Sequence, residues 1–375
     1  MLWSNKHVMS RWMSYLARWV QFGSHTLVTA VVIGAAAYLG SSPLVLSQQA
    51  PLERIVFATN WKAQAAHGGF YQALADGTYR RYGLDVVIRQ GGPQVNNAAL
   101  LPAKRIDFLM TGNLLHSFDA QKNGLPTVAV AAIFQKDPQA LLAHPGQGYE
   151  RFSALSRAPT VFIAKDAQFS WWQWLKQRHG FKDASLRPYN YSLGPFLSNP
   201  RSVQQGYSVA EPIYVERQSG MKPIVHLLAD HGYSTYSTLI LTHRDTIATR
   251  SQVVRRFVEA SILGWVNYLY GDRRAANVMM IADNPEMTVA EIEAAVRLMR
   301  EQGIVDSGEA LTAGIGAMNA ARVADFYQQM VEAGLYAADE VELSALIDTR
   351  FVNQGAGLDL KRQLLDTAKD KANSQ

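Results

Sequence analysis

The sequence of 375 residues contains no cysteine. This absence excludes disulfides, thiol chemistry and a lipid-modified N-terminal cysteine. The chain also lacks the His-Glu-x-x-His zinc motif, the Gly-x-Ser-x-Gly nucleophile elbow and the Walker phosphate loop. We therefore expect no metal, no cofactor and no catalytic residue, and we predict that the chain is not an enzyme.

Long blocks of like charge are absent as well. The formal net charge is +5, and three of the positive charges, on Lys6, Arg11 and Arg18, lie in the first fifty residues, which leaves 5 − 3 = +2 for the remainder. Neighbouring arginines there occur as isolated pairs, such as Arg80 and Arg81. Because a nucleic-acid footprint needs clustered Lys and Arg, we do not expect nucleic acid as a partner.

The first fifty residues differ in kind from the rest. A basic segment without acids, residues 1–26, precedes an apolar run at 27–39 and a segment of small and polar residues that ends at Ala50. This order is typical of a secretory signal peptide, and export without cysteine suits a bacterial periplasm. If the apolar run extends to Leu46 it is long enough to span a bilayer, so an uncleaved N-terminal anchor is the alternative.

The remaining chain predicts an α/β fold with a sizeable core. Four apolar and β-branched runs, at 54–58, 84–88, 106–110 and 128–134, alternate with helical patterns. Such alternation is typical of a doubly wound, mostly parallel sheet flanked by helices. Each of these strands ends in a polar or aromatic loop, where ligands collect in open α/β sheets.

The length of the chain favours two lobes. A new strand and helix pattern begins at residue 160, and an extended run near residue 239 predicts a return strand. The predicted organisation is residues 51–142 as the N-terminal part of lobe 1, 143–238 as lobe 2, 239–358 as a mostly helical C-terminal part of lobe 1, and 359–375 as a flexible tail.

One stretch, residues 59–73, combines a strand end, a polar loop and a helix start. Asn60, Trp61, Gln64 and His67 place two amides, an indole and an imidazole at this corner. Together they could recognise a flat, polar, nitrogen-bearing molecule. The alternative is that Trp61 is a core residue and Asn60 forms a turn, and the stretch alone does not decide between the two.

The same stretch resembles a known family. Asn60-Trp61, the run His67-Gly68-Gly69-Phe70-Tyr71-Gln72-Ala73 and the segment Gly83-Leu84-Asp85-Val86 are similar to the start of the thiamine-pyrimidine family (NMT1/THI5-like) and of related ABC transporter binding proteins. The residues Gly124-Leu125-Pro126-Thr127, the pair Trp171-Trp172 and the segments Gln205-Gly206-Tyr207 and Glu211-Pro212 continue the similarity, which covers roughly residues 53–355.

The resemblance implies a two-lobed periplasmic-binding-protein type II fold with a hinge of two crossings. It further implies that a monomer in the periplasm captures a pyrimidine-like solute and delivers it to the permease and ATPase subunits of an ABC importer. Membrane contact is then expected through the transporter, or through the N-terminal anchor if it is retained.

We predict that the ligand lies between the lobes. An indole can stack on a planar ring, and a carboxylate can accept two N–H bonds from an amino-substituted, ring-protonated pyrimidine. The predicted ligand-binding residues are Asn60, Trp61, Gln64, His67, Gly112, Asn113, Trp172, Tyr207 and Glu211.

Three alternatives remain open. The ligand could be a sulfonate, a nitrate or an aromatic acid, as in neighbouring families, although the opening motif offers only Lys62 to an anion. The chain could be a pyrimidine-precursor enzyme of the same fold, but such relatives use a histidine and a cysteine-rich iron site. It could also be an anchored binding lobe that serves a sensor or scaffold.

Overall fold

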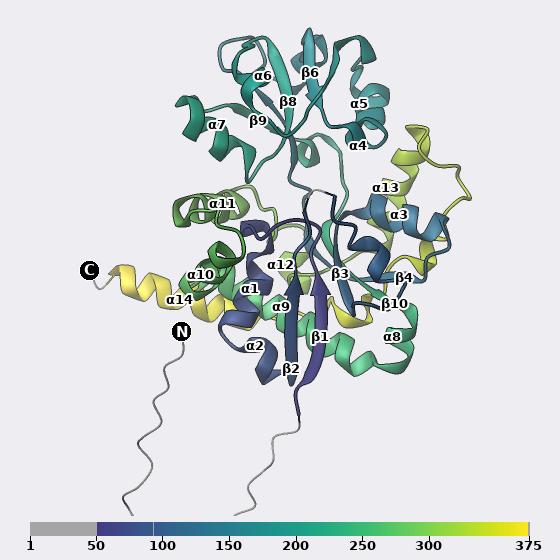
Figure 1. The fold of residues 1–375 in the computed structure, drawn as a ribbon, viewed down its shortest axis with the longest axis vertical. Coiled ribbons are helices and arrows are strands. Elements are labelled where there is room, and N and C mark those ends of the chain that lie inside the picture. The colour runs from purple at the N-terminus through teal and green to yellow at the C-terminus, as the bar shows by residue number, and fades with distance from the viewer. Residues whose placement is uncertain (1–50, 93, 374–375) are drawn as a thin grey trace, which may run out of the picture. The chain divides into compact units, whose positions relative to one another are not determined.

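The computed structural model describes residues 51–92 and 94–373 (Figure 1). The predicted signal or anchor segment, residues 1–50, lies outside the described residues. Within the described part of the chain, no helix combines the length and the apolar character that a bilayer crossing requires.

The first lobe is built on a mixed five-stranded sheet with the order β2-β1-β3-β10-β4. Its strands β1 to β3 pair in parallel, whereas β10 pairs antiparallel with β3 and β4, so four of the five strands point the same way. All eight residues of β4 are buried, as expected for a strand covered on both faces. The strands are β1 (Glu53–Ala58), β2 (Leu84–Arg89), β3 (Phe108–Asn113), β4 (Thr127–Phe134) and β10 (Ser237–His243).

The second lobe repeats this arrangement with the order β7-β6-β8-β5-β9. Strands β6, β7 and β8 are parallel, and β5 runs antiparallel to both β8 and β9. The predicted fold, two lobes with mostly parallel sheets flanked by helices, is therefore confirmed. The strands are β5 (Gln139–Ala143), β6 (Thr160–Ile163), β7 (Leu186–Pro188), β8 (Ser202–Tyr207) and β9 (Ile224–Leu227).

Helices flank both sheets (Figure 1). In the second lobe they are α4 (Lys165–Gln168), α5 (Trp171–His179), α6 (Gly194–Leu197) and α7 (Glu211–Ser219). The others are α1 (Gly68–Ala75), α2 (Thr78–Arg81), α3 (Leu114–Lys122), α8 (Arg244–Thr249), α9 (Ser251–Tyr270), α10 (Arg274–Asp283), α11 (Val289–Glu301), α12 (Ala310–Ala313), α13 (Ala320–Glu332) and α14 (Leu358–Asn373).

Helix α9 forms the centre of the first lobe's core. Its apolar residues are buried, and the Phe257 ring stacks on Phe108 with ring centroids 4.0 Å apart and on Tyr79 at 5.5 Å. The stripe packs α9 against β1, β3 and α1, because a helix with apolar residues on one face must bury that face. This core fixes the strand ends on which the cleft is built.

Two crossings connect the lobes, one between β4 and β5 and one between β9 and β10. The first crossing lies a few residues before the boundary predicted at residue 143, because β5 continues the second sheet instead of the first. The buried carboxylate of Asp137 lies in the first crossing and ties it to the end of β3. It accepts hydrogen bonds from the Gln139 amide at 2.8 Å and from Asn113 Nδ2 at 3.1 Å.

A second set of contacts joins the lobes at α7 and α11. The Arg217 guanidinium of α7 forms an ion pair with Glu291 of α11, whose side chain is 6% exposed. Glu291 also completes the capping box with Thr288 that begins α11. Ser208 Oγ donates to Gln302 Oε1 at 2.6 Å. The lobes therefore touch both at the crossings and along this seam.

The C-terminal segment differs from its prediction. Residues 358–373 form α14 instead of a flexible tail. Leu360 and Leu364, four residues apart, pack against the core, and Lys361 Nζ lies 2.5 Å from Asp306 Oδ2. A single apolar edge and one ion pair hold the first half of this helix on the first lobe.

Candidate functional site

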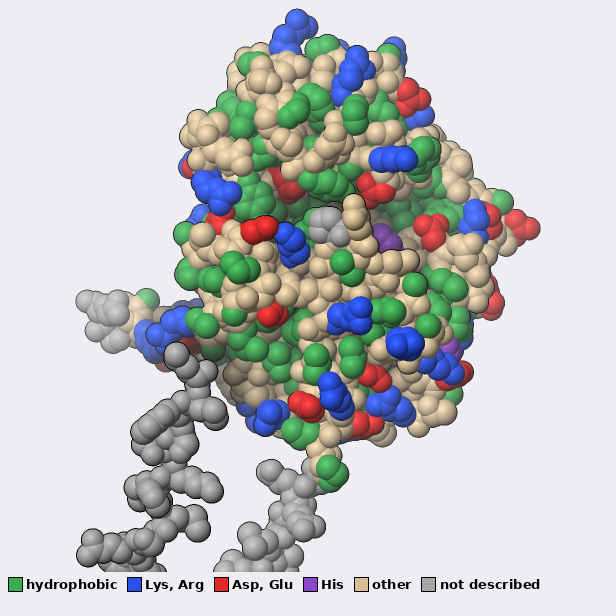
Figure 2. Space-filling view, viewed as in Figure 1, with side chains coloured by type: hydrophobic (Ala, Val, Ile, Leu, Met, Phe, Trp, Pro, Cys, Tyr) green, Lys and Arg blue, Asp and Glu red, His purple; other side chains and the backbone are tan. Residues whose placement is uncertain are grey.

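A cavity of about 290 Å³ lies between the two lobes. Figure 2 shows the hollow between the upper and the lower lobe, with acidic side chains on its upper rim. In both sheets the carboxyl ends of the parallel strands face this space, which is where ligands bind in open α/β folds. The lining residues are Asn60, Trp61, Gln64, Ala66, His67, Met110, Thr238, Gln139, Asp166, Tyr189, Tyr191, Gln205, Gly206, Tyr207, Ala210, Glu211 and Tyr214.

Most of the predicted site residues meet here, from both lobes. Those that line the cavity are Asn60, Trp61, Gln64, His67, Tyr207 and Glu211. The alternative that Trp61 is a core residue is wrong, because Trp61 is only half-buried and lines the cavity.

Three predicted residues do not line the cavity. Trp172 is fully buried in the second lobe, where its indole N–H donates to Asp183 Oδ1 at 2.8 Å. The Asn113 side chain caps α3 and bonds Asp137, so its polar atoms are already used. Gly112 lies beside it at the end of β3, and its carbonyl accepts a hydrogen bond from Ser237 Oγ at 2.7 Å.

The loop after β1 is held by hydrogen bonds that leave its longer side chains free. Thr59 Oγ1 donates to the Trp61 carbonyl at 2.8 Å, and the Ala63 amide donates to Gln90 Oε1 at 2.7 Å. Gly91 packs so closely that a Cβ there would lie 2.5 Å from the Asn60 carbonyl carbon. The loop is thus fixed through its backbone, and it presents the Asn60, Trp61 and Gln64 side chains to the cavity.

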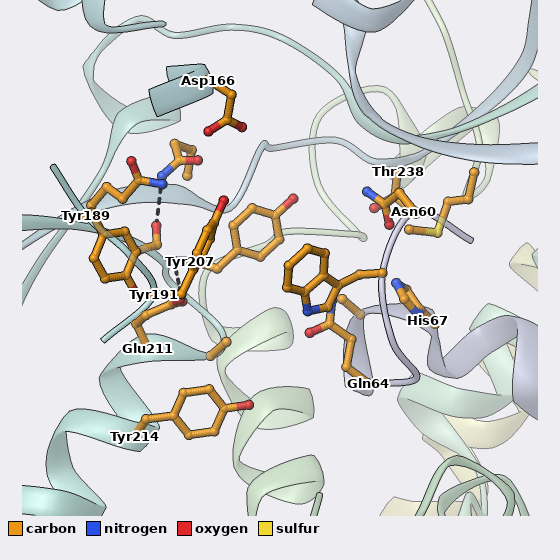
Figure 3. A pocket seen from close by; sticks show the side chains of 17 residues that line it. Asn60, Gln64, His67, Asp166, Tyr189, Tyr191, Tyr207, Glu211, Tyr214 and Thr238 are labelled. Carbon is orange, nitrogen blue, oxygen red and sulfur yellow. Dashed lines mark hydrogen bonds between the residues drawn. The ribbon is translucent and has the colours of Figure 1, made fainter. Parts of the chain in front are cut away.

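His67 is buried at the end of the short 3-10 helix Ala65–His67 and lines the first-lobe wall (Figure 3). Burial lowers its pKa to about 3, so the imidazole is neutral near pH 7. Neither ring nitrogen has a hydrogen-bond partner among the described residues. Buried polar atoms are normally paired, so one N–H donor and one acceptor remain for a molecule in the cavity.

Glu211 begins α7 and lies over β8, on the opposite wall. Its Oε2 accepts the Tyr207 amide at 2.7 Å, and burial raises its pKa. No Lys or Arg of residues 51–92 and 94–373 forms an ion pair with this carboxylate. Gly206 provides its space, since a Cβ there would lie 2.9 Å from Glu211 Cβ.

Five aromatic side chains surround the space between these groups. Trp61 of the first lobe faces Tyr191 of the second, with ring centroids 6.0 Å apart and planes inclined by 37°. Tyr191 in turn lies 5.3 Å from Tyr189. Tyr207 and Tyr214 complete the set (Figure 3). A planar ring in this cavity can stack on one of these aromatic faces.

The charge of the lining is negative. It includes the carboxylates of Asp166 and Glu211 and no Lys or Arg. Lys62, the single cation of the opening loop, lies 2.9 Å from Glu286 and does not line the cavity. Among the described residues no cluster of His, Asp and Glu is placed to hold a metal ion. The site therefore suits a neutral or cationic organic molecule.

The sequence prediction missed several lining residues. Tyr189 and Tyr191 belong to the segment Pro188-Tyr189-Asn190-Tyr191 that directly follows β7, and Asp166 follows β6. Their position after a strand end was the available signal. Thr238 and Tyr191 have φ values of 51° and 59°, which residues with a Cβ rarely adopt. Such backbone strain clusters at ligand sites, but it leaves no mark in the sequence.

Comparisons with known proteins identify the family and the fold. The family model described as "NMT1/THI5 like" matches residues 64–272. No curated protein matches the chain. Among solved structures, the periplasmic aliphatic sulphonate binding protein SsuA from Escherichia coli is 16% identical with a TM-score of 0.56, over 79% of this chain and 92% of that one.

Two further structures share the fold. The alkanesulfonate-binding protein SsuA from Xanthomonas axonopodis pv. citri, bound to MOPS, is 12% identical with a TM-score of 0.56, over 80% of this chain and 99% of that one. The desulfurization enzyme DszB is 12% identical with a TM-score of 0.52, over 83% and 99%. At these identities the likeness establishes the fold, that of type II periplasmic binding proteins, and leaves the ligand to the site.

Proposed function

The chain belongs to the NMT1/THI5-like family, and we propose on this basis that it is the solute-binding component of an ABC importer. In this proposal the protein is a periplasmic monomer that captures a small nitrogen heteroaromatic of the aminopyrimidine type. It hands this ligand to a permease driven by an ATPase. The observation that carries the ligand class is the lining of the cavity, which combines five aromatic side chains with two carboxylates and no cation.

The carboxylate of Glu211 supplies the directional contact. A carboxyl group whose pKa is raised by burial shares a proton readily with a weakly basic ring nitrogen. The exocyclic amino group and the ring N–H can then donate two parallel bonds to the two carboxylate oxygens, and charge-assisted bonds of this kind are stronger than neutral ones. Anions gain nothing from this group, since like charge opposes them.

The aromatic walls and His67 supply the remaining contacts. Stacking of the ring on Trp61 contributes about 0.5–1.5 kcal/mol beyond its burial of area, as in other aromatic pairs. The neutral imidazole of His67 offers a donor and an acceptor to a substituent on the side of the first lobe. Because these groups come from both lobes, the ligand stabilises the closed arrangement over an open one.

An anionic ligand is the second candidate, because the SsuA proteins of similar fold bind sulfonates. The lining opposes it, since an anion would face Asp166 and Glu211 with no Lys or Arg to neutralise it. Catalysis on this fold, as in DszB, is the third candidate. A pyrimidine-forming reaction with a cysteine-rich iron site is opposed by the absence of cysteine.

A thermal-shift screen tests the proposal. Aminopyrimidines, nucleobases, alkanesulfonates and aromatic acids are compared at equal concentration near neutral pH. A ligand present at about 100 times its Kd adds roughly 2.7 kcal/mol to the free energy of unfolding, so a true ligand raises Tm clearly. We expect the rise with aminopyrimidines and its loss in Glu211→Gln. A rise confined to sulfonates or aromatic acids would overturn the proposed ligand class.

A further inference from the structure

The cavity does not end at its aromatic walls. It continues into an open trough of about 580 Å³ on the second lobe. Asp166, Tyr189 and Tyr191 line both spaces, so they mark the junction between them. A cavity of about 290 Å³ with such an extension can hold a ligand that is longer than one substituted ring.

Asp166 is the charged group at this junction. Its carboxylate is exposed and forms no ion pair with a Lys or Arg of the described residues. In Figure 3 it points into the space above Tyr191 and Tyr207, whereas Glu211 lies below them. The carboxylates of Asp166 and Glu211 thus lie on opposite sides of the Tyr191 and Tyr207 rings. One compact cation cannot pair with both of them.

Tyr191 separates the two spaces. Its φ is 59°, 62% of the residue is exposed, and its ring centroid lies 6.0 Å from that of Trp61. Burial, and then the charges of Asp166 and Glu211, raise the pKa of its hydroxyl, so both carboxylates act on this side chain. Phe169, 73% exposed, lines the trough beyond it. A cation that passes Tyr191 therefore meets aromatic faces and Asp166 together.

We propose that the trough is a second subsite, which receives an arm of the ligand that ends in an ammonium or another cationic nitrogen paired with Asp166. This inference rests on the proposed function, since the ring must first occupy the inner cavity. The ligand class is then a nitrogen heteroaromatic with a cationic side arm. Aromatic faces attract such a cation in addition to the carboxylate. Lys165 lines the trough but not the cavity, so an acidic arm would have to pass Asp166 before reaching it.

The test compares matched ligands by isothermal titration calorimetry on the intact protein. The probes are 4-aminopyrimidine, the same ring with a 5-aminomethyl, 5-(2-aminoethyl) or 5-(3-aminopropyl) arm, and hydroxyl-terminated arms of equal length. We expect at least one ammonium arm to bind about two- to fivefold more tightly than its hydroxyl partner, as for an exposed ion pair. Asp166→Asn should remove this difference between the ammonium and hydroxyl arms. Because Asp166 also lines the inner cavity, the affinity for 4-aminopyrimidine should fall as well, but by less than the affinity for the ammonium arm.

Glu150→Gln is the matched control, because it removes one exposed carboxylate from the same lobe outside both spaces. It should preserve the preference for the ammonium arm. If the ring binds but ammonium and hydroxyl arms bind equally, or if the preference survives Asp166→Asn, the second subsite is wrong while the proposed function stands. If no compound of the series binds, the proposed function and this inference both fall.

Discussion

Trp61 and Trp172 are both predicted ligand-binding residues, and the structure places them in opposite environments. Trp172 is fully buried, with its indole N–H on Asp183 and its ring 5.5 Å from Phe181. Trp61 is half-buried and lines the cleft, with its ring centroid 6.0 Å from that of Tyr191. Replacing each by alanine should therefore separate folding from binding.

The magnitudes follow from these environments. Trp172→Ala removes a buried aromatic ring, which costs about 3–5 kcal/mol, and a hydrogen bond worth about 1 kcal/mol. Trp61→Ala leaves the core intact, so its cost in stability should stay below about 1.5 kcal/mol. A tryptophan side chain buries roughly 200 Å², so one face of the indole covers about 100 Å² of a stacked ligand. At about 25 cal/mol/Å², this buried area contributes about 2.5 kcal/mol to the free energy of binding. That corresponds to a loss of about 70-fold in affinity.

Urea denaturation gives the free energy of unfolding, and isothermal titration with 4-aminopyrimidine gives Kd. We expect Trp172→Ala to be strongly destabilised but to bind normally below its unfolding transition. We expect Trp61→Ala to be nearly as stable as the wild type and to bind weakly. Equal losses of affinity in the two variants would refute the placement of Trp61 as the stacking residue.

Three further predictions address the space around Glu211, the seam and the crossings. Gly206→Ala should lower ligand affinity more than tenfold, because the added Cβ would lie 2.9 Å from Glu211 Cβ and displace that side chain; titration against the wild type measures this. The same Cβ would lie 3.0 Å from the buried Leu142 Cδ1, so the titration is made below the unfolding transition of the variant. Arg217→Ala breaks the ion pair with Glu291 along the seam, so it should increase the radius of gyration of the ligand-free protein in solution scattering and speed ligand release. The control Lys222→Ala breaks an exposed ion pair within the second lobe and should change neither quantity. Burial raises the pKa of Asp137 to about 6. Between about pH 4 and pH 6 the Asp137 carboxyl therefore keeps its proton in the folded state but loses it in the unfolded chain. The free energy of unfolding consequently falls as pH rises through this window. The free energy of unfolding of Asp137→Asn, relative to the wild type, should therefore increase by about 2–3 kcal/mol from pH 4 to pH 7, and a difference that does not change with pH would contradict the assignment.

The sequence predicted the secondary structure of the first lobe well, because its strands and the long helix α9 have strong local patterns. The first crossing was harder to place. The run 139–143 has the composition of any buried strand, and only its pairing with β8 and β9 assigns it to the second lobe. Pairing between distant segments is not encoded in local periodicity.

The binding site shows the same difference between features set by local sequence and features set by contacts between distant segments. Asn60, Trp61, Gln64 and His67 were predicted because they form one dense polar loop. The cavity residues of the second lobe come from separate segments of the chain. Of these the sequence predicted Tyr207 and Glu211, and it missed Asp166, Tyr189 and Tyr191. Trp172 was misplaced because α5 is buried on more than one face, where Trp171, Trp172 and Trp174 are all inaccessible. A helical wheel cannot distinguish a face that packs on Phe181 from one that lines a cleft.

The central claim is that the cavity selects a nitrogen heteroaromatic and rejects anions. The most direct test is to titrate the protein with 4-aminopyrimidine and with a short alkanesulfonate in the same low-salt buffer. We predict that the aminopyrimidine binds at least about 100-fold more tightly, a difference of about 2.8 kcal/mol, because the sulfonate meets two carboxylates and no cation. Tighter binding of the sulfonate would contradict the account.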